Sequence, residues 1–166
     1  ARRILFIDTP FENEIGGDKN RSRFLFEKLN GAFEAELILI IQSDRTPGRP
    51  AFTNLKPALC LSAKRGPWYK SESVFDFGTS EVRAFQDLLD KSCYDAVFFC
   101  YHSAWGLADI AAKHSSQPAI IFDMAMISSR IVEQVWKQAP SIKNRWFFFE
   151  YLKLRILEQQ LFRQPF

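Results

Sequence analysis

The fold class of this chain is decided by two apolar runs, Arg3-Ile-Leu-Phe-Ile-Asp8 and Tyr94-Asp-Ala-Val-Phe-Phe-Cys-Tyr101. Each run is short and almost continuously apolar, a pattern typical of a strand buried on both faces of a parallel sheet. Residues 36–41 and 118–123 have the same character, and segments with helical spacing of apolar residues separate the four runs. Strong strands that alternate with helices predict an α/β domain with a doubly wound, mainly parallel, Rossmann-like sheet.

Weaker signals complete this outline. Residues 42–72 are rich in Pro, Gly, Lys and Arg without a sustained period, and we expect a long excursion there. Short strands are expected near 58–61 and 74–77. The first helix is expected to run from a cap at Asp18 to Gly31, and the second from a cap at Thr79 or Ser80 to about Lys91. A third helix is expected from about 104 to 114. Two more are expected before and after Pro140, and the last of them should run from about 141 to 164.

Size and composition are those of one globular domain. The chain has 166 residues, of which 47% are hydrophobic and 25% charged. It has 17 Phe and 4 Trp, and we expect some of these rings to cover a surface that contacts another domain, lipid or a partner. No segment approaches the roughly 18 apolar residues of a transmembrane helix, and Arg2 and Arg3 lead into the first strand without the small-residue cleavage region of a signal peptide. These features predict a cytoplasmic protein.

The net charge of +3 equals the excess of basic over acidic residues within 140–166. A nucleic-acid-binding protein usually has a stronger basic stripe, so nucleic acid is not an expected partner. The same basic and aromatic segment predicts peripheral contact with the inner face of a membrane. The three cysteines are odd in number and lack the spacing of metal ligands, so we expect reduced structural thiols and no metal site.

Ligands of parallel sheets bind beyond the carboxyl ends of the strands, which directs attention to the residues after each apolar run. Asp8 ends the first run, and it is followed by the pair Gly16-Gly17, whose backbone can approach a phosphate at the start of a helix. Arg21 is expected in the first turn of that helix, where a cation is unfavourable unless an anion lies nearby. Taken alone, the two glycines fit a plain turn equally well.

His102, Asp123 and Ser128 are the candidates after the other strands. His102 directly follows an apolar run, so its imidazole is predicted at the mouth of the sheet, within reach of a sugar hydroxyl or a phosphate. Asp123 ends the fourth run and either caps the next turn or faces the cleft. Ser128 can hold a polar ligand or cap a helix.

Taken in order, these segments resemble the N-terminal half of family-four glycosyltransferases, which have the GT-B fold. The likeness covers most of the chain except residues 42–72, and only the order of the motifs gives it weight. The matching pieces are Arg3-Ile-Leu-Phe-Ile with Gly16-Gly17-Asp-Lys-Asn-Arg21, Tyr94-Asp-Ala-Val-Phe-Phe with His102, Ile120-Ile-Phe-Asp123 with Ser128-Ser129-Arg130, and Phe149-Glu150-Tyr-Leu-Lys-Leu-Arg155-Ile-Leu-Glu158.

The resemblance implies a retaining transfer of a sugar from a nucleotide-sugar to a glycan, lipid-linked or envelope acceptor. Residues 1–166 would form the N-terminal, acceptor-side domain of a larger enzyme, inactive without a C-terminal donor-binding domain, and 42–72 would recognise the acceptor. Gly16 and Gly17 would lie near the donor phosphates and His102 would reach the donor sugar, with no further cofactor. Relatives often carry an acidic residue where this chain has Met126, which leaves the role of Asp123 open.

Glu150 and Glu158 have the spacing of a known glycosyltransferase signature, but in that family the signature belongs to the other domain. Here both lie in the expected last helix, and we interpret them as solvated charges beside Lys153 and Arg155.

Three alternatives use the same kind of sheet. A phosphate-accepting receiver domain is excluded because Asp8 has no acidic neighbour and the late strand ends in Asp123 rather than Lys. A stand-alone Rossmann-like domain that binds a nucleotide, flavin or phosphate stays open, because one glycine pair cannot distinguish phosphates. A protein-interaction module without catalysis, using the aromatic last helix, stays open as well. A second Rossmann-like domain in the full gene would favour the enzyme.

Overall fold

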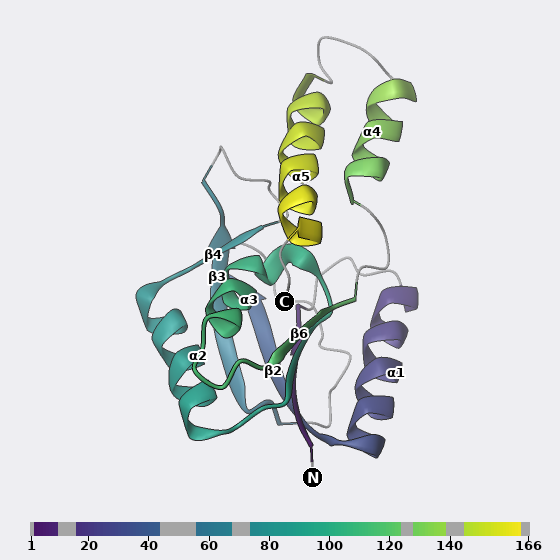
Figure 1. The fold of residues 1–166 in the computed structure, drawn as a ribbon. Helices are drawn as coiled ribbons and strands as arrows, with labels where there is room; N and C mark the ends of the chain where they lie inside the picture. Colours follow the sequence, from purple (N-terminus) through teal and green to yellow (C-terminus); the bar gives the residue numbers. More distant parts are fainter. Residues whose placement is uncertain are drawn as a thin grey trace.

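The computed structural model describes residues 2–9, 16–43, 56–67, 74–123, 128–138 and 145–163, which form an α/β fold (Figure 1). Six strands make one sheet in the order β4-β3-β2-β1-β5-β6, and neighbouring strands are parallel except β3 and β4. The predicted doubly wound, mainly parallel, Rossmann-like sheet is confirmed. The strands are β1 (Arg3–Asp8), β2 (Glu34–Gln42), β3 (Leu59–Arg65), β4 (Phe75–Phe77), β5 (Ala96–Phe99) and β6 (Ala119–Phe122).

Helices cover both faces of the sheet. The smaller core cluster joins Phe26 of the first helix to Phe6 and Leu37, while the larger cluster joins Leu5 and Ile7 to the second and third helices. Because Phe6 and its neighbours in β1 point to opposite faces, this one strand contributes to both clusters. The helices are α1 (Gly16–Ala32), α2 (Thr79–Lys91), the short 3₁₀ helix η1 (His102–Ala104), α3 (Trp105–Ala112), α4 (Ser128–Gln138) and α5 (Arg145–Arg163).

Helix α1 differs from the expectation at both ends. It begins at Gly16, so Asp18 lies inside the helix instead of capping it. It also continues through Gly31, which does not have the positive φ of a helix-terminating glycine. A glycine inside a helix costs only about 1 kcal/mol relative to alanine. We infer that packing of Phe26 against the sheet offsets this cost.

The expectation of burial on both faces holds for β1 and is wrong for β6. Ile120 and Phe122 pack against the larger core cluster, whereas Ala119 and Ile121 are exposed. The physical reason is position: β6 is the outer strand of the described sheet, and the described helices do not cover its second face. An apolar run therefore identified the strand without showing how many of its faces are covered.

Helices α4 and α5 pack side by side and project beyond the carboxyl edge of the sheet (Figure 1). The interpretation of Glu150 and Glu158 as solvated charges is wrong, because both are buried, as is Leu154 between them. Several large apolar side chains of α5 are exposed instead. These are Trp146, Phe148, Phe149, Leu152 and Ile156.

Two further expectations concern the excursion and the membrane. Within 42–72, the short strand expected near 58–61 is confirmed by β3, while residues 44–55 and 68–73 lie outside the described residues. In the part of the chain that the structure describes, no helix combines the length and the hydropathy needed to cross a bilayer.

Tyr94 connects the segment before β5 to β2. Its hydroxyl donates a hydrogen bond to Oε2 of Glu36 (2.9 Å), whose other carboxylate oxygen accepts one from Arg3. Burial, and then the hydrogen bond to Glu36, raise the pKa of Tyr94 to about 12. We expect Tyr94→Phe to lower the free energy of unfolding by about 1 kcal/mol at pH 7, measured by urea denaturation.

The pH dependence of this difference follows from the raised pKa. Between the ordinary tyrosine pKa of about 10 and the folded-state value, the folded chain keeps a proton that the unfolded chain has lost. The contribution of Tyr94 is therefore complete below about pH 10 and disappears as the pH rises towards 12. A difference between wild type and variant that stays constant up to pH 12 would contradict this account.

Candidate functional site

The order of the strands creates a crevice between β1 and β5. The chain moves outward from β1 through β2 to β3, then returns to the other side of β1 with β5 and β6. Such a reversal is where open α/β sheets bind ligands, at the carboxyl ends of the strands. Ile7 aligns with Phe99 in the register of β1 and β5, and the amide of Cys100 donates to the carbonyl of Ile7 (3.0 Å). The next residues, Asp8 and Cys100, therefore lie next to each other at the carboxyl edge of the sheet.

Asp8 is a buried acid at the end of β1. It is 2% exposed, and among the described residues no group hydrogen-bonds to its Oδ1. Burial raises its pKa above the usual range, against weaker opposing contributions from the Ser22 hydroxyl, the Thr9 amide and the Cys100 thiol. A buried carboxyl with an unused oxygen is unfavourable for folding, which is common where a binding site needs the group.

The thiol of Cys100 lies beside this acid. Burial, followed by the negative charge of Asp8, raises the pKa of Cys100 far above the usual range. The charge of Asp123 acts in the same direction, so the three side chains belong to one electrostatic cluster. A thiol held in its protonated form is a poor nucleophile, and we assign Cys100 a packing role.

Arg21 and Asp123 form a two-pronged ion pair across the site. Nε of Arg21 donates to Oδ2 of Asp123 (2.8 Å) and Nη2 donates to Oδ1 (2.5 Å). The pair joins α1 to the end of β6, where the amide of Asp123 is held by the carbonyl of Phe99 (2.8 Å). Arg21 is 48% exposed and Asp123 15% exposed, so the guanidinium is accessible to a ligand. Two residues predicted separately for the site are thus in direct contact.

The structure places the backbone of the other predicted residues as follows. Gly16 and Gly17 are the first residues of α1, so their amides belong to the helix end that has no intrahelical partners. The expectation that Arg21 lies in the first turn is wrong: it lies in the second turn, because α1 begins before Asp18. His102 begins η1, directly after β5, and Ser128 begins α4. The His102 imidazole and the Ser128 hydroxyl lie outside the described part of the structure, as does Met126.

Sequence inspection missed two buried hydroxyls near this edge. Ser22 neighbours Arg21 in α1 and lies close to Asp8. Ser103 follows His102 in η1, and its Oγ has no hydrogen-bond partner within the described ranges. Ser103 carried a usable signal, because it is a small polar residue just beyond the carboxyl end of an apolar run. Ser22 carried none, since a serine in a helix is ordinary.

Comparison with models of protein families, with curated proteins and with solved structures finds no match for this chain. Within the described ranges, no three His, Cys, Asp or Glu side chains are grouped as metal ligands.

Proposed function

We propose that the crevice beyond β1 and β5 binds the diphosphate and sugar of a nucleotide-sugar, and that the chain is the N-terminal half of a retaining glycosyltransferase. The acceptor would be a glycan, a lipid-linked or an envelope molecule. The observation that carries the proposal is the Arg21–Asp123 pair, which places an accessible guanidinium and a carboxylate at the carboxyl edge of β6 beside the buried acid Asp8.

The start of α1 supplies the second support. Helix amino ends present free N–H groups and a partial positive charge, and they are common binding sites for phosphate. Gly16 and Gly17 let a ligand approach the backbone closely, because neither residue has a side chain. Arg21 is on the same helix and offers a planar fork of donors that matches two phosphate oxygens.

The ion pair suggests how the two parts of the ligand would be handled. A diphosphate competes with Asp123 for the guanidinium of Arg21. Once Arg21 turns to the phosphate, the carboxylate of Asp123 can accept a hydrogen bond from a sugar hydroxyl. The imidazole of His102, from the neighbouring strand end, is our proposed contact to the transferred sugar, and the hydroxyl of Ser128 to a polar part of the substrate.

Binding to this chain tests the proposal without requiring turnover. We expect isothermal titration calorimetry with a panel of nucleoside-diphosphate sugars to detect at least one ligand, and Arg21→Gln to weaken it about tenfold. Arg23→Gln is the matched control, because Arg23 lies on the same helix, is also exposed and also pairs with an acid, Glu27 (2.8 Å). Its affinity should be that of the wild type.

The comparison ligands distinguish this proposal from its nearest alternative. If pyrophosphate and nucleoside diphosphates bind as tightly as any nucleotide-sugar, the site is that of a phosphate- or nucleotide-binding domain without sugar recognition. Equal losses in Arg21→Gln and Arg23→Gln would remove the crevice from the proposal altogether. Three further points stay predictions. They are the sugar transfer itself, the presence of a C-terminal domain that binds the donor, and a location at the inner face of the membrane.

A further inference from the structure

A second candidate site lies on the other face of the sheet. It is a pocket of about 420 Å³ between β4, α2, α3 and α5. Its wall residue Phe75 belongs to the larger core cluster, whereas Cys100 beside Asp8 belongs to the smaller one. The sheet therefore separates the pocket from the Arg21–Asp123 pair. The volume is in the range of small-molecule sites.

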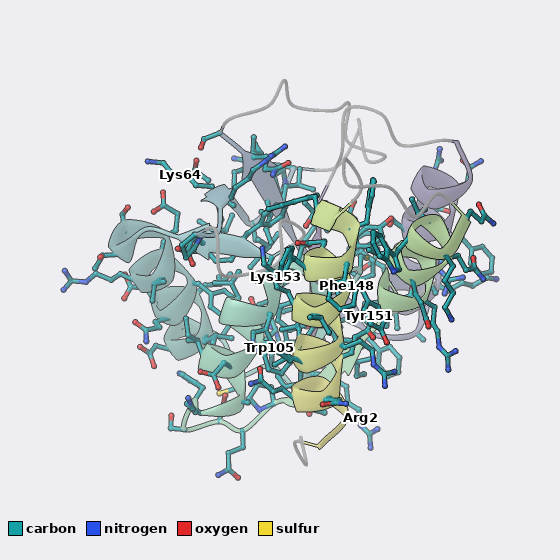
Figure 2. All side chains as sticks on the ribbon, turned by 90° about the horizontal axis from the view of Figure 1, so that it is seen from above. Arg2, Lys64, Trp105, Phe148, Tyr151 and Lys153 are labelled. Carbon is teal, nitrogen blue, oxygen red and sulfur yellow. The ribbon has the colours of Figure 1, made fainter. Side chains whose placement is uncertain are left out.

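The wall of the pocket is mainly apolar and contains three aromatic rings, Phe75, Phe77 and Trp105. The indole of Trp105 is held in place because it stacks on Phe122 (5.9 Å between ring centres), which in turn stacks on Phe99 (5.0 Å). Figure 2 shows Trp105 and Lys153 on one side of α5, and Phe148 and Tyr151 on the side towards α4. A fixed flat ring at the wall suits an apolar ring or chain.

The polar side chains of the described wall are Asp76, Lys153 and Gln160. Nζ of Lys153 lies 3.7 Å from Oε2 of Glu150 and 4.6 Å from the ring centre of Trp146, so its position is constrained. Lys153 is positively charged, whereas Asp76 and Glu150, the ion-pair partner of Lys153, are negatively charged. An anionic ligand would therefore meet like charges at this wall, and a cationic ligand would meet the like charge of Lys153.

Together Asp76, Lys153 and Gln160 offer both hydrogen-bond donors and hydrogen-bond acceptors. The ammonium of Lys153 donates hydrogen bonds, the carboxylate of Asp76 accepts them, and the amide of Gln160 does both. A hydroxyl group can pair with each of the three, because it both donates and accepts. We propose that this pocket binds an uncharged amphiphile, with an apolar chain or ring against Trp105 and a hydroxylated head group at Asp76, Lys153 and Gln160. Identifying this ligand as the sugar acceptor rests on the proposed function, whereas the binding itself does not.

A series of octyl amphiphiles tests the proposal, because only the head group changes. Octyl glucoside, octyl sulfate and octyltrimethylammonium are titrated into the full chain below their micelle concentrations, with tryptophan fluorescence and calorimetry as readouts. We expect octyl glucoside to bind about tenfold more tightly than either ionic amphiphile. Equal affinities for the three head groups, or a preference for an ionic one, overturn the proposal.

Two variants connect binding to this pocket. Lys153→Met should weaken octyl glucoside about tenfold, since it removes a charged donor. Lys137→Met is the matched control, because Lys137 is also helical and pairs with an acid one turn earlier, Glu133 (2.7 Å). Gly106→Leu should abolish binding by filling the pocket, because a Cβ at Gly106 already lies 3.9 Å from the ring of Phe77. If binding survives Gly106→Leu in a folded protein, the ligand is elsewhere.

A measurement on the wild type covers the case in which Gly106→Leu does not fold. In heteronuclear NMR spectra, octyl glucoside should shift the indole signal of Trp105 more than that of Trp136, which packs against Phe148. The opposite order overturns the assignment. Vesicles of phosphatidylcholine with a neutral glycolipid distinguish two sources of the ligand. If the wild type co-sediments with these vesicles and Lys153→Met does not, the ligand is an amphiphile in a membrane. If the wild type does not co-sediment, the ligand is a free amphiphile.

The outcome is separable from that for the nucleotide-sugar site. Arg21→Gln should leave the affinity for octyl glucoside unchanged, and Lys153→Met should leave the affinity for the nucleotide-sugar unchanged. Loss of octyl glucoside binding in Arg21→Gln would mean that the two sites are not independent and would remove this pocket as a separate site.

Discussion

Replacing Phe6 with alanine is expected to lower the free energy of unfolding by about 3–5 kcal/mol, the largest effect of any substitution considered. Phe6 is 0% exposed at the centre of β1. Its ring stacks on Phe98 (5.2 Å between ring centres, planes at 7°) and meets the edge of Phe26 (5.3 Å, 74°). The substitution leaves a cavity between the sheet and α1 that neither neighbour can fill without moving.

Phe24→Ala is the matched control on α1. Phe24 is 57% exposed, and its described ring contact is with the ammonium of Lys28 (5.5 Å). Removing an exposed contact of this kind costs about 1 kcal/mol or less. Urea denaturation at pH 7 measures both variants. Similar losses for the two would mean that the smaller core cluster does not stabilise the fold as its burial indicates.

Replacing Asp8 with asparagine is expected to raise the free energy of unfolding at pH 7, because it removes a buried charge whose cost is about 1.4 kcal/mol for each unit by which burial raises the pKa of Asp8. Asparagine has the same shape but does not ionise, so the variant no longer buries a charge. The same change should weaken binding of a ligand hydroxyl at the crevice. Greater stability with weaker binding is expected when a residue is retained for function rather than folding.

The pH dependence gives this prediction its sharpest test. Because burial raises the folded-state pKa of Asp8, the folded chain keeps a proton that the unfolded chain loses. The free energy of unfolding of the wild type therefore falls as the pH rises from the unfolded pKa, about 4, through the raised folded value. Asp8→Asn should lack this fall, so its advantage should grow between pH 4 and pH 7. An advantage that is constant over this range, or absent, would falsify the account.

Local pattern was sufficient for the central strands and for α2. The runs at 3–8 and 36–41 are apolar except at their ends because both of their faces are covered, and the same requirement made them visible in the sequence. Helix α2 (Thr79–Lys91) lies where it was predicted, although its N-cap is Gly78, and Thr79 and Ser80 lie inside the helix instead of capping it. At the ends of α1 the same rules were wrong, because packing against the sheet outweighs the preferences of single residues at a helix end.

The local sequence pattern did not predict the burial of side chains where that burial depends on another helix or strand. Residues 119–122 look like a central strand, yet β6 is the outer strand of the described sheet and one of its faces is exposed. Glu150 and Glu158 look like surface charges, yet both are buried while Phe149 on the same helix is exposed. In both cases the sequence predicted the helix or strand correctly. The predicted and observed burial differ because burial depends on which other elements pack against that helix or strand.

The sequence by itself determined that four apolar runs make a doubly wound, mainly parallel sheet and that its ligand edge follows those runs, because continuous apolarity is a local property. Only the tertiary structure decided that Arg21 meets Asp123, which is 102 positions away, and that Asp8 is buried beside Ser22 and Cys100. Those contacts follow from β1 lying between β2 and β5. The order of strands depends on long-range pairing, which no local periodicity encodes.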